Sequence, residues 1–140
     1  MITQGQCTIF KQNCLSALEN FAVGTPYTYK IALYTASANL DETTLAYTSV
    51  GEVVGTGYTA TGKPLTISQV PTSSGITAYV SFDNVTWSPA SFTTRGALIY
   101  NSTTGAAVAV LNFGADKTPT TSFTITFPTA DAQDAIIRFS

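Results

Sequence analysis

The sequence contains no histidine and has few charged residues of either sign. Six Lys or Arg and eight Asp or Glu make up 10% of its 140 residues, against about 25% in an average soluble domain. Histidine is the commonest general base and the commonest zinc ligand, so its absence excludes most catalytic and zinc-site patterns. The formal net charge of −2, with scattered basic residues, argues against nucleic-acid binding, which depends on neutralising phosphates. We therefore expect no enzymatic activity and no nucleic-acid partner.

Long hydrophobic runs are also missing. The longest apolar run covers residues 106–111, whereas a membrane-spanning helix needs about 20 residues. The first residues, MITQGQ, lack the basic and apolar regions of a secretory signal. The sequence predicts neither a membrane partner nor a cleaved leader.

Cysteine is scarce, with Cys7 and Cys14 alone in the chain. On a helix their Cα atoms would lie about 10.5 Å apart, beyond the limit of about 7 Å for a disulfide. We expect both thiols to stay reduced and to act as small buried apolar residues, without a metal or redox role.

Hydroxyl side chains take the place of charges, with 25 Thr and 12 Ser in the chain. A compact protein of this size exposes about 7,000 Å², which leaves about 500 Å² for each charge. Burial of a hydroxyl group costs little free energy once the group is hydrogen-bonded, whereas burial of a charge costs much more. This composition favours a surface packed against neighbouring subunits, and we predict a homo-oligomer (a dimer, a trimer or a larger array) whose assembly is insensitive to salt. A monomeric Thr-rich β protein is the alternative.

A helix is predicted only at the N-terminus, over residues 3–21. Apolar side chains recur there at helical spacing, at Cys7, Phe10, Cys14, Ala17, Leu18 and Phe21. Thr3 and Gln6 fit a capping box, and Gly24 with Pro26 would end the helix.

Residues 27–139 read as strands and turns, typical of an antiparallel β-sandwich or jelly-roll-like domain. Alternating or apolar segments predict strands at 27–35, 65–70, 76–85, 97–101, 107–113, 123–127 and 135–139, with short edge pieces at 43–47 and 50–54. Residues 102–106 form a hairpin loop, and longer loops are expected at 36–42, 55–64, 71–75, 86–94 and 114–121. No repeat or linker interrupts the chain, so we predict one mainly β domain over residues 1–140.

No constellation of residues predicts a catalytic, cofactor or metal site. The eight acids mostly lie in or beside predicted turns, where short acidic side chains cap backbone amides: Glu19, Asp41, Glu42, Glu52, Asp83, Asp116, Asp131 and Asp134. Asp41-Glu42 and Asp131 with Asp134 have too few ligands for a calcium loop. Gly55, Gly57 and Gly62 do not match a phosphate-binding motif, and we interpret them as turn residues with positive φ.

The 16 aromatic residues offer an alternative function. Exposed Trp and Tyr rings can stack on sugars, so Trp87 with neighbouring Tyr residues could form a carbohydrate-binding platform. Core packing explains most of these rings better, since they fall on apolar strand faces. The triplets at Asn84 and Asn101 match the glycosylation pattern, which we interpret as chance.

Four segments together resemble a family of small structural proteins of tailed bacteriophages. They are residues 29–35 (YKIALYT) with the following loop 36–40, 55–59 (GTGYT), 95–102 (RGALIYNS) and 123–139, which contains FPTAD and AIIR. The resemblance covers nearly the full length, and none of its motifs is chemical.

The resemblance implies a non-enzymatic virion protein that is assembled in the bacterial host cytoplasm. Its partners would be other virion proteins, either the major capsid protein or tail proteins. Size, strand pattern and low charge favour a capsid decoration (cement) protein that binds and stabilises the shell through surface contacts. A tail, baseplate or fibre-associated protein is the alternative within the same family.

Overall fold

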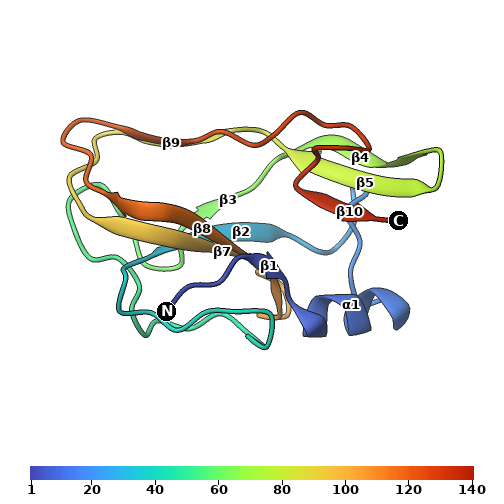
Figure 1. Cartoon of the computed structure of the whole chain (residues 1–140), viewed down its shortest axis with the longest axis horizontal. Helices are drawn as coiled ribbons and strands as arrows, with labels where there is room; N and C mark the ends of the chain where they lie inside the picture. The colour runs from blue at the N-terminus through green and yellow to red at the C-terminus, as the bar shows by residue number, and fades with distance from the viewer.

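Residues 1–140, all described by the computed structural model, form two layers of β-structure and one short helix (Figure 1). The lower layer in Figure 1 is a five-stranded antiparallel sheet in the order β1-β8-β7-β2-β3. Its strands are β1 (Gly5–Gln6), β8 (Ala107–Lys117), β7 (Thr94–Asn101), β2 (Tyr29–Tyr34) and β3 (Lys63–Pro64).

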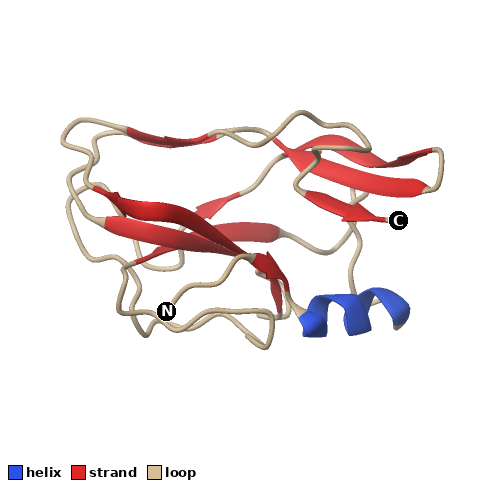
Figure 2. Ribbon diagram, in the orientation of Figure 1, coloured by secondary structure: helices blue, strands red, loops and turns tan.

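The second layer is divided into two smaller antiparallel sheets (Figure 2). One is three-stranded, in the order β10-β5-β4, and the other is the pair β6-β9. Their strands are β10 (Ile137–Phe139), β5 (Thr77–Phe82), β4 (Ile67–Ser74), β6 (Val85–Trp87) and β9 (Phe123–Ile125). A single cluster of 30 buried hydrophobic residues joins the layers. The predicted mainly β fold with antiparallel sheets packed together and one N-terminal helix is confirmed, and the helix is short.

The central strands of the five-stranded sheet are buried on both faces. In β2, Ile31 and Ala32 point to opposite faces, and both are fully buried. Leu40 and Val53, from the chain between β2 and β3, are also buried and belong to the same cluster. Strands covered on both sides read as nearly continuous apolar runs, which explains the sequence AVAVL at the start of β8.

Strand boundaries differ from the sequence prediction where partners are distant. The segment predicted over 76–85 divides at Asp83, whose amide donates to the carbonyl of Thr66. β5 therefore ends at Phe82, and β6 begins at Val85 in a different sheet. The expected loop over 71–75 is wrong, because most of it continues β4 into a tight hairpin with β5. The expected edge strands 43–47 and 50–54 are also wrong, since they form only isolated bridges.

The helix α1 (Thr8–Leu15) is much shorter than the predicted 3–21. Residues 3–6, predicted as its first turn, are not helical, because their backbone groups pair with other segments. The backbone amide of Thr3 donates to the carbonyl of Leu40 at 2.8 Å, and β1 pairs with β8. The predicted capping box is absent, because the side-chain Nε2 of Gln6 donates to the carbonyl of Arg138 and the N-cap residue, Cys7, makes no side-chain cap.

The helix ends at Leu15, with Ser16 as its C-cap, ahead of the predicted stop at Gly24. Ala17 adopts a left-handed conformation, with φ of 59°. The amide of Leu18 donates to Asn13 O at 2.8 Å, and that of Ala17 donates to Cys14 O, the bond pattern of a Schellman cap. Sequence patterns miss this stop because the position is usually glycine.

We expect Ala17→Gly to stabilise the protein by about 0.5–1 kcal/mol. Glycine relieves the strain of a left-handed Cβ, and Ala17 is exposed, so little packing is lost. Urea denaturation of the variant and the wild type measures the difference. Ala22→Gly, at an exposed residue without a positive φ, is the control. An Ala17→Gly variant no more stable than the wild type would contradict the strain.

Candidate interaction surface

The acidic residues are spread over the molecule and serve local structure. Asp131 accepts hydrogen bonds from the amides of Gln133 and Asp134, and Asp41 accepts from Thr43. Asp116 pairs with Arg95 in an exposed ion pair at 3.3 Å. No group of three or more His, Cys, Asp or Glu side chains could hold a metal ion. The one helix is neither long nor apolar enough to cross a membrane.

Glu52 lies at the centre of a tyrosine cluster that the sequence analysis did not identify. Its carboxylate accepts hydrogen bonds from Tyr47 Oη at 2.5 Å, Tyr58 Oη at 2.6 Å and the amide of Thr61 at 2.8 Å. Tyr100 stacks on Tyr47 at 5.0 Å and donates to the carbonyl of Thr61. Both carboxylate oxygens thus accept hydrogen bonds, and the cluster ties the chain between β2 and β3 to the sheet.

Glu19 is a second half-buried carboxylate with structural partners. It accepts hydrogen bonds from Tyr29 Oη and Asn101 Nδ2, each at 3.2 Å. Partial burial raises the pKa of the Glu19 carboxyl above its ordinary value, and these hydrogen bonds reduce the shift. Asn101 itself is fully buried and accepts from the amides of Thr103 and Thr104. Its glycosylation-like triplet is therefore part of the β7–β8 turn.

Trp87, the residue proposed for sugar stacking, is 1% exposed. Its ring lies 6.4 Å from Tyr58 and 6.0 Å from Phe123, and the ammonium group of Lys63 lies over it. The prediction that it belongs to the core is confirmed. The carbohydrate-binding alternative loses its main stacking ring.

Both cysteines are free thiols, as expected. Cys7 is fully buried, and Cys14 is half-buried on α1. Burial raises the pKa of both thiols to about 11, so both are protonated at neutral pH and unreactive as nucleophiles.

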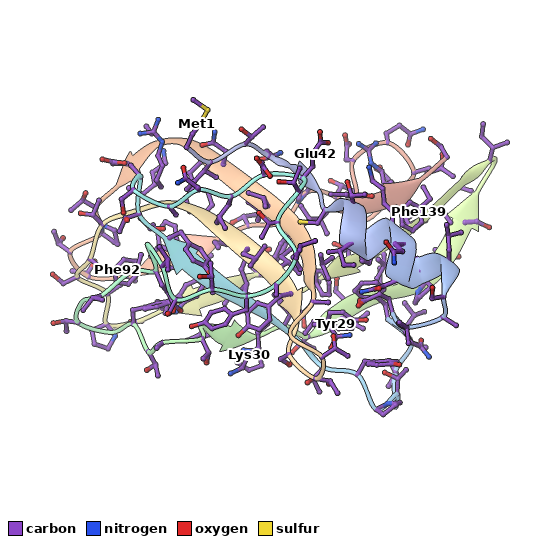
Figure 3. All side chains as sticks on the ribbon, turned by 90° about the horizontal axis from the view of Figure 1, so that it is seen from below. Met1, Tyr29, Lys30, Glu42, Phe92 and Phe139 are labelled. Atoms are coloured by element: carbon purple, nitrogen blue, oxygen red, sulfur yellow. The ribbon has the colours of Figure 1, made fainter.

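Exposed apolar side chains gather at one end of the molecule, where α1, β10 and the β4–β5 hairpin meet. We call this the helix–hairpin end and define it by Leu15, Leu18, Val70, Ile76 and Phe139, which are 92%, 46%, 43%, 90% and 41% exposed. Figure 3 shows Phe139 beside α1, with the hairpin extending past the helix.

The helix covers only part of the three-stranded sheet. Phe82, Val80 and Ile137 are buried, whereas Ala78 and Phe139, paired in register farther along β5 and β10, are exposed. An apolar groove of about 100 Å³ lies between α1 and this sheet. A second hollow of about 360 Å³ lies beside Leu15 and shares Cys14 and Phe139 with the groove.

The helix–hairpin end is also nearly free of charge. Residues 64–82, which include the whole hairpin, contain no Asp, Glu, Lys or Arg, and neither do residues 12–18. Two charged side chains border this end, since Lys11 lines the second hollow and Glu19 lines the groove. This surface can be desolvated at low cost, because the burial of apolar and hydroxyl groups costs less free energy than the burial of charges.

Comparison of the chain with protein-family models, with curated proteins and with solved structures finds no match.

Proposed function

We propose that the chain is a non-enzymatic structural protein of a bacteriophage virion, which acts by binding other virion proteins through its surface. Within that role we propose a capsid decoration protein that bridges neighbouring shell subunits. The resemblance of the four sequence segments supports the virion role, and the sparse charge supports a surface covered by partners.

The observation that carries this proposal is an exposed, apolar and sparsely charged surface at the helix–hairpin end, which suits contact with another subunit of an assembly, whether a shell protein or a further copy of the chain. Isolated exposed apolar residues are ordinary on protein surfaces. Here several lie near a mostly apolar groove whose one charged lining residue is Glu19, a combination that marks protein–protein contact sites. A decoration protein needs only modest contacts, because binding to many shell sites at once multiplies their effect.

Virions of the encoding phage provide the test. We expect the protein in purified particles at a copy number comparable to that of the major capsid protein, and we expect recombinant protein to bind shells that lack it. Quantitative mass spectrometry measures the first, and co-sedimentation with shells measures the second.

Two outcomes separate the alternatives. A few copies per particle, recovered with isolated tails, would replace the decoration role with a tail or baseplate role. Absence from purified virions would overturn the structural proposal altogether.

A further inference from the structure

We propose that the helix–hairpin end binds a second copy of this chain in a two-fold symmetric dimer, with each hairpin tip packed against the partner's α1. A symmetric dimer needs a self-complementary patch, in which the same surface carries both halves of the contact. The helix–hairpin end carries a projecting apolar tip and an apolar hollow.

The projecting half is the turn of the β4–β5 hairpin. Ser74 pairs with Thr77, so Gly75 and Ile76 form a two-residue turn, and Gly75 supplies the positive φ of 60°. Ile76 stands at this tip with 90% of its surface exposed. Polar residues usually occupy such turns, so Ile76 is an unusual residue at this position and offers an exposed apolar side chain to a partner.

The receiving half is the hollow beside α1. It is lined by Lys11, Cys14, Leu15 and Phe139, and its volume of about 360 Å³ accommodates an aliphatic side chain. Leu15 forms one wall and is 92% exposed. No apolar residue of the same chain covers the Leu15 side chain.

The placement of the two halves suits a two-fold axis. Figure 1 shows α1 and the hairpin tip projecting at the same end of the molecule, on opposite sides of its long axis. A rotation of 180° about an axis between them exchanges the two sides. Each hairpin tip then meets the partner's helix, and both contacts form at once.

Charge and area agree with a second copy as the occupant. Residues 64–82 and 12–18 carry no charge, and only Lys11 and Glu19 border the hollow and the groove. A highly charged partner would find few counter-charges there, whereas another copy presents an equally apolar surface. A standard interface takes about 800 Å² from each partner, and this chain exposes 7095 Å². Residues 70–76 are exposed at every position, and Thr8, Lys11, Gln12 and Leu15 of α1 are exposed as well, so the contact can extend over both elements.

Sedimentation velocity over a range of concentrations tests the dimer. We expect the wild type to be dimeric at low and high salt, and we expect Ile76→Asp and Leu15→Asp to weaken self-association more than about tenfold, because each buries a carboxylate in an apolar contact. Val54→Asp is the matched control. Val54 is 94% exposed and next to Gly55, which packs against Phe92, at the opposite end in Figure 3. Circular dichroism checks that each variant is folded.

A disulfide experiment tests the pairing itself. In a Cys14→Ser background, Ile76→Cys and Leu15→Cys proteins are mixed and oxidised, and we expect a cross-linked dimer that contains one of each. Links between two Ile76→Cys chains alone would overturn the reciprocal arrangement.

Self-association and virion binding are separable in these experiments. A wild-type chain that is monomeric at every concentration, or a dimer that Ile76→Asp leaves intact, would overturn the dimer and leave the virion proposal standing. A monomer that binds phage shells through Ile76 would assign the helix–hairpin end to a virion protein instead.

Discussion

Replacing Glu52 with Ala is expected to destabilise the protein by about 3 kcal/mol or more. Glu52 accepts hydrogen bonds from Tyr47, Tyr58 and the amide of Thr61, and a hydrogen bond to a charged group contributes about 1.5–3 kcal/mol. The Tyr58 hydroxyl also accepts from the amide of Leu33 in β2. Loss of the carboxylate therefore loosens both the loop and its attachment to the central sheet.

Glu52→Gln is expected to lose much less, about 1 kcal/mol. The side-chain oxygen of Gln still accepts from Tyr58 and Thr61, while its nitrogen can donate to the Tyr47 hydroxyl. Urea denaturation measures both variants, and a loss of 3 kcal/mol corresponds to a midpoint lower by about 1.5 M or more.

Glu42→Ala is the matched control, because Glu42 is an exposed acid of the same loop and only its backbone carbonyl is hydrogen-bonded. It should change stability by less than about 0.5 kcal/mol. Equal losses for the Glu42 and Glu52 variants would show that the tyrosine cluster does not hold the loop.

Gly62→Ala is expected to cost more than about 3 kcal/mol and to prevent folding if the wild type is only marginally stable. Gly62 has a φ of 80°, and a Cβ there would lie 1.9 Å from the carbonyl oxygen of Ile31. Ile31 is in the central strand β2 and pairs with Lys63 of β3. The methyl group must push β3 away from β2, in addition to the cost of a left-handed non-glycine residue.

Gly105→Ala separates these two costs. Gly105 has a similar φ of 84°, but nothing lies within 4 Å of the added Cβ. It should lose only about 1–2 kcal/mol, the backbone term alone. Thermal and urea unfolding of both variants give the comparison, and equal losses would mean that the contact with Ile31 relaxes without cost.

The sequence by itself predicted those parts of the fold whose partners are close in the chain. The β7–β8 hairpin has its five-residue loop at 102–106, as predicted, because turn residues and apolar strands are adjacent there. Ile125 in β9 and Phe127 just after it are buried. The alternation of apolar and polar residues over 123–127 predicts this by itself. Gly57 and Gly62 have the predicted positive φ, whereas Gly55 does not.

Distant partners decided the rest of the backbone. Residues 3–6 have a helical pattern, but the carbonyl of Leu40 and the edge of β8 take their backbone groups. Hydrogen bonds that are already made to a sheet cannot also form a helical turn. The same reason divides 76–85 at Asp83, because the partner, Thr66, lies in another part of the chain.

The tyrosine cluster around Glu52 and the proposed interaction surface also depend on tertiary structure. Neither Glu52 nor its tyrosines follow a periodic pattern, so only folding brings them together. The composition indicated a surface poor in charge, but it could not place the apolar residues of α1, β10 and the β4–β5 hairpin at one end. Their proximity follows from the pairing of β5 with both β4 and β10 and from a helix too short to cover the sheet.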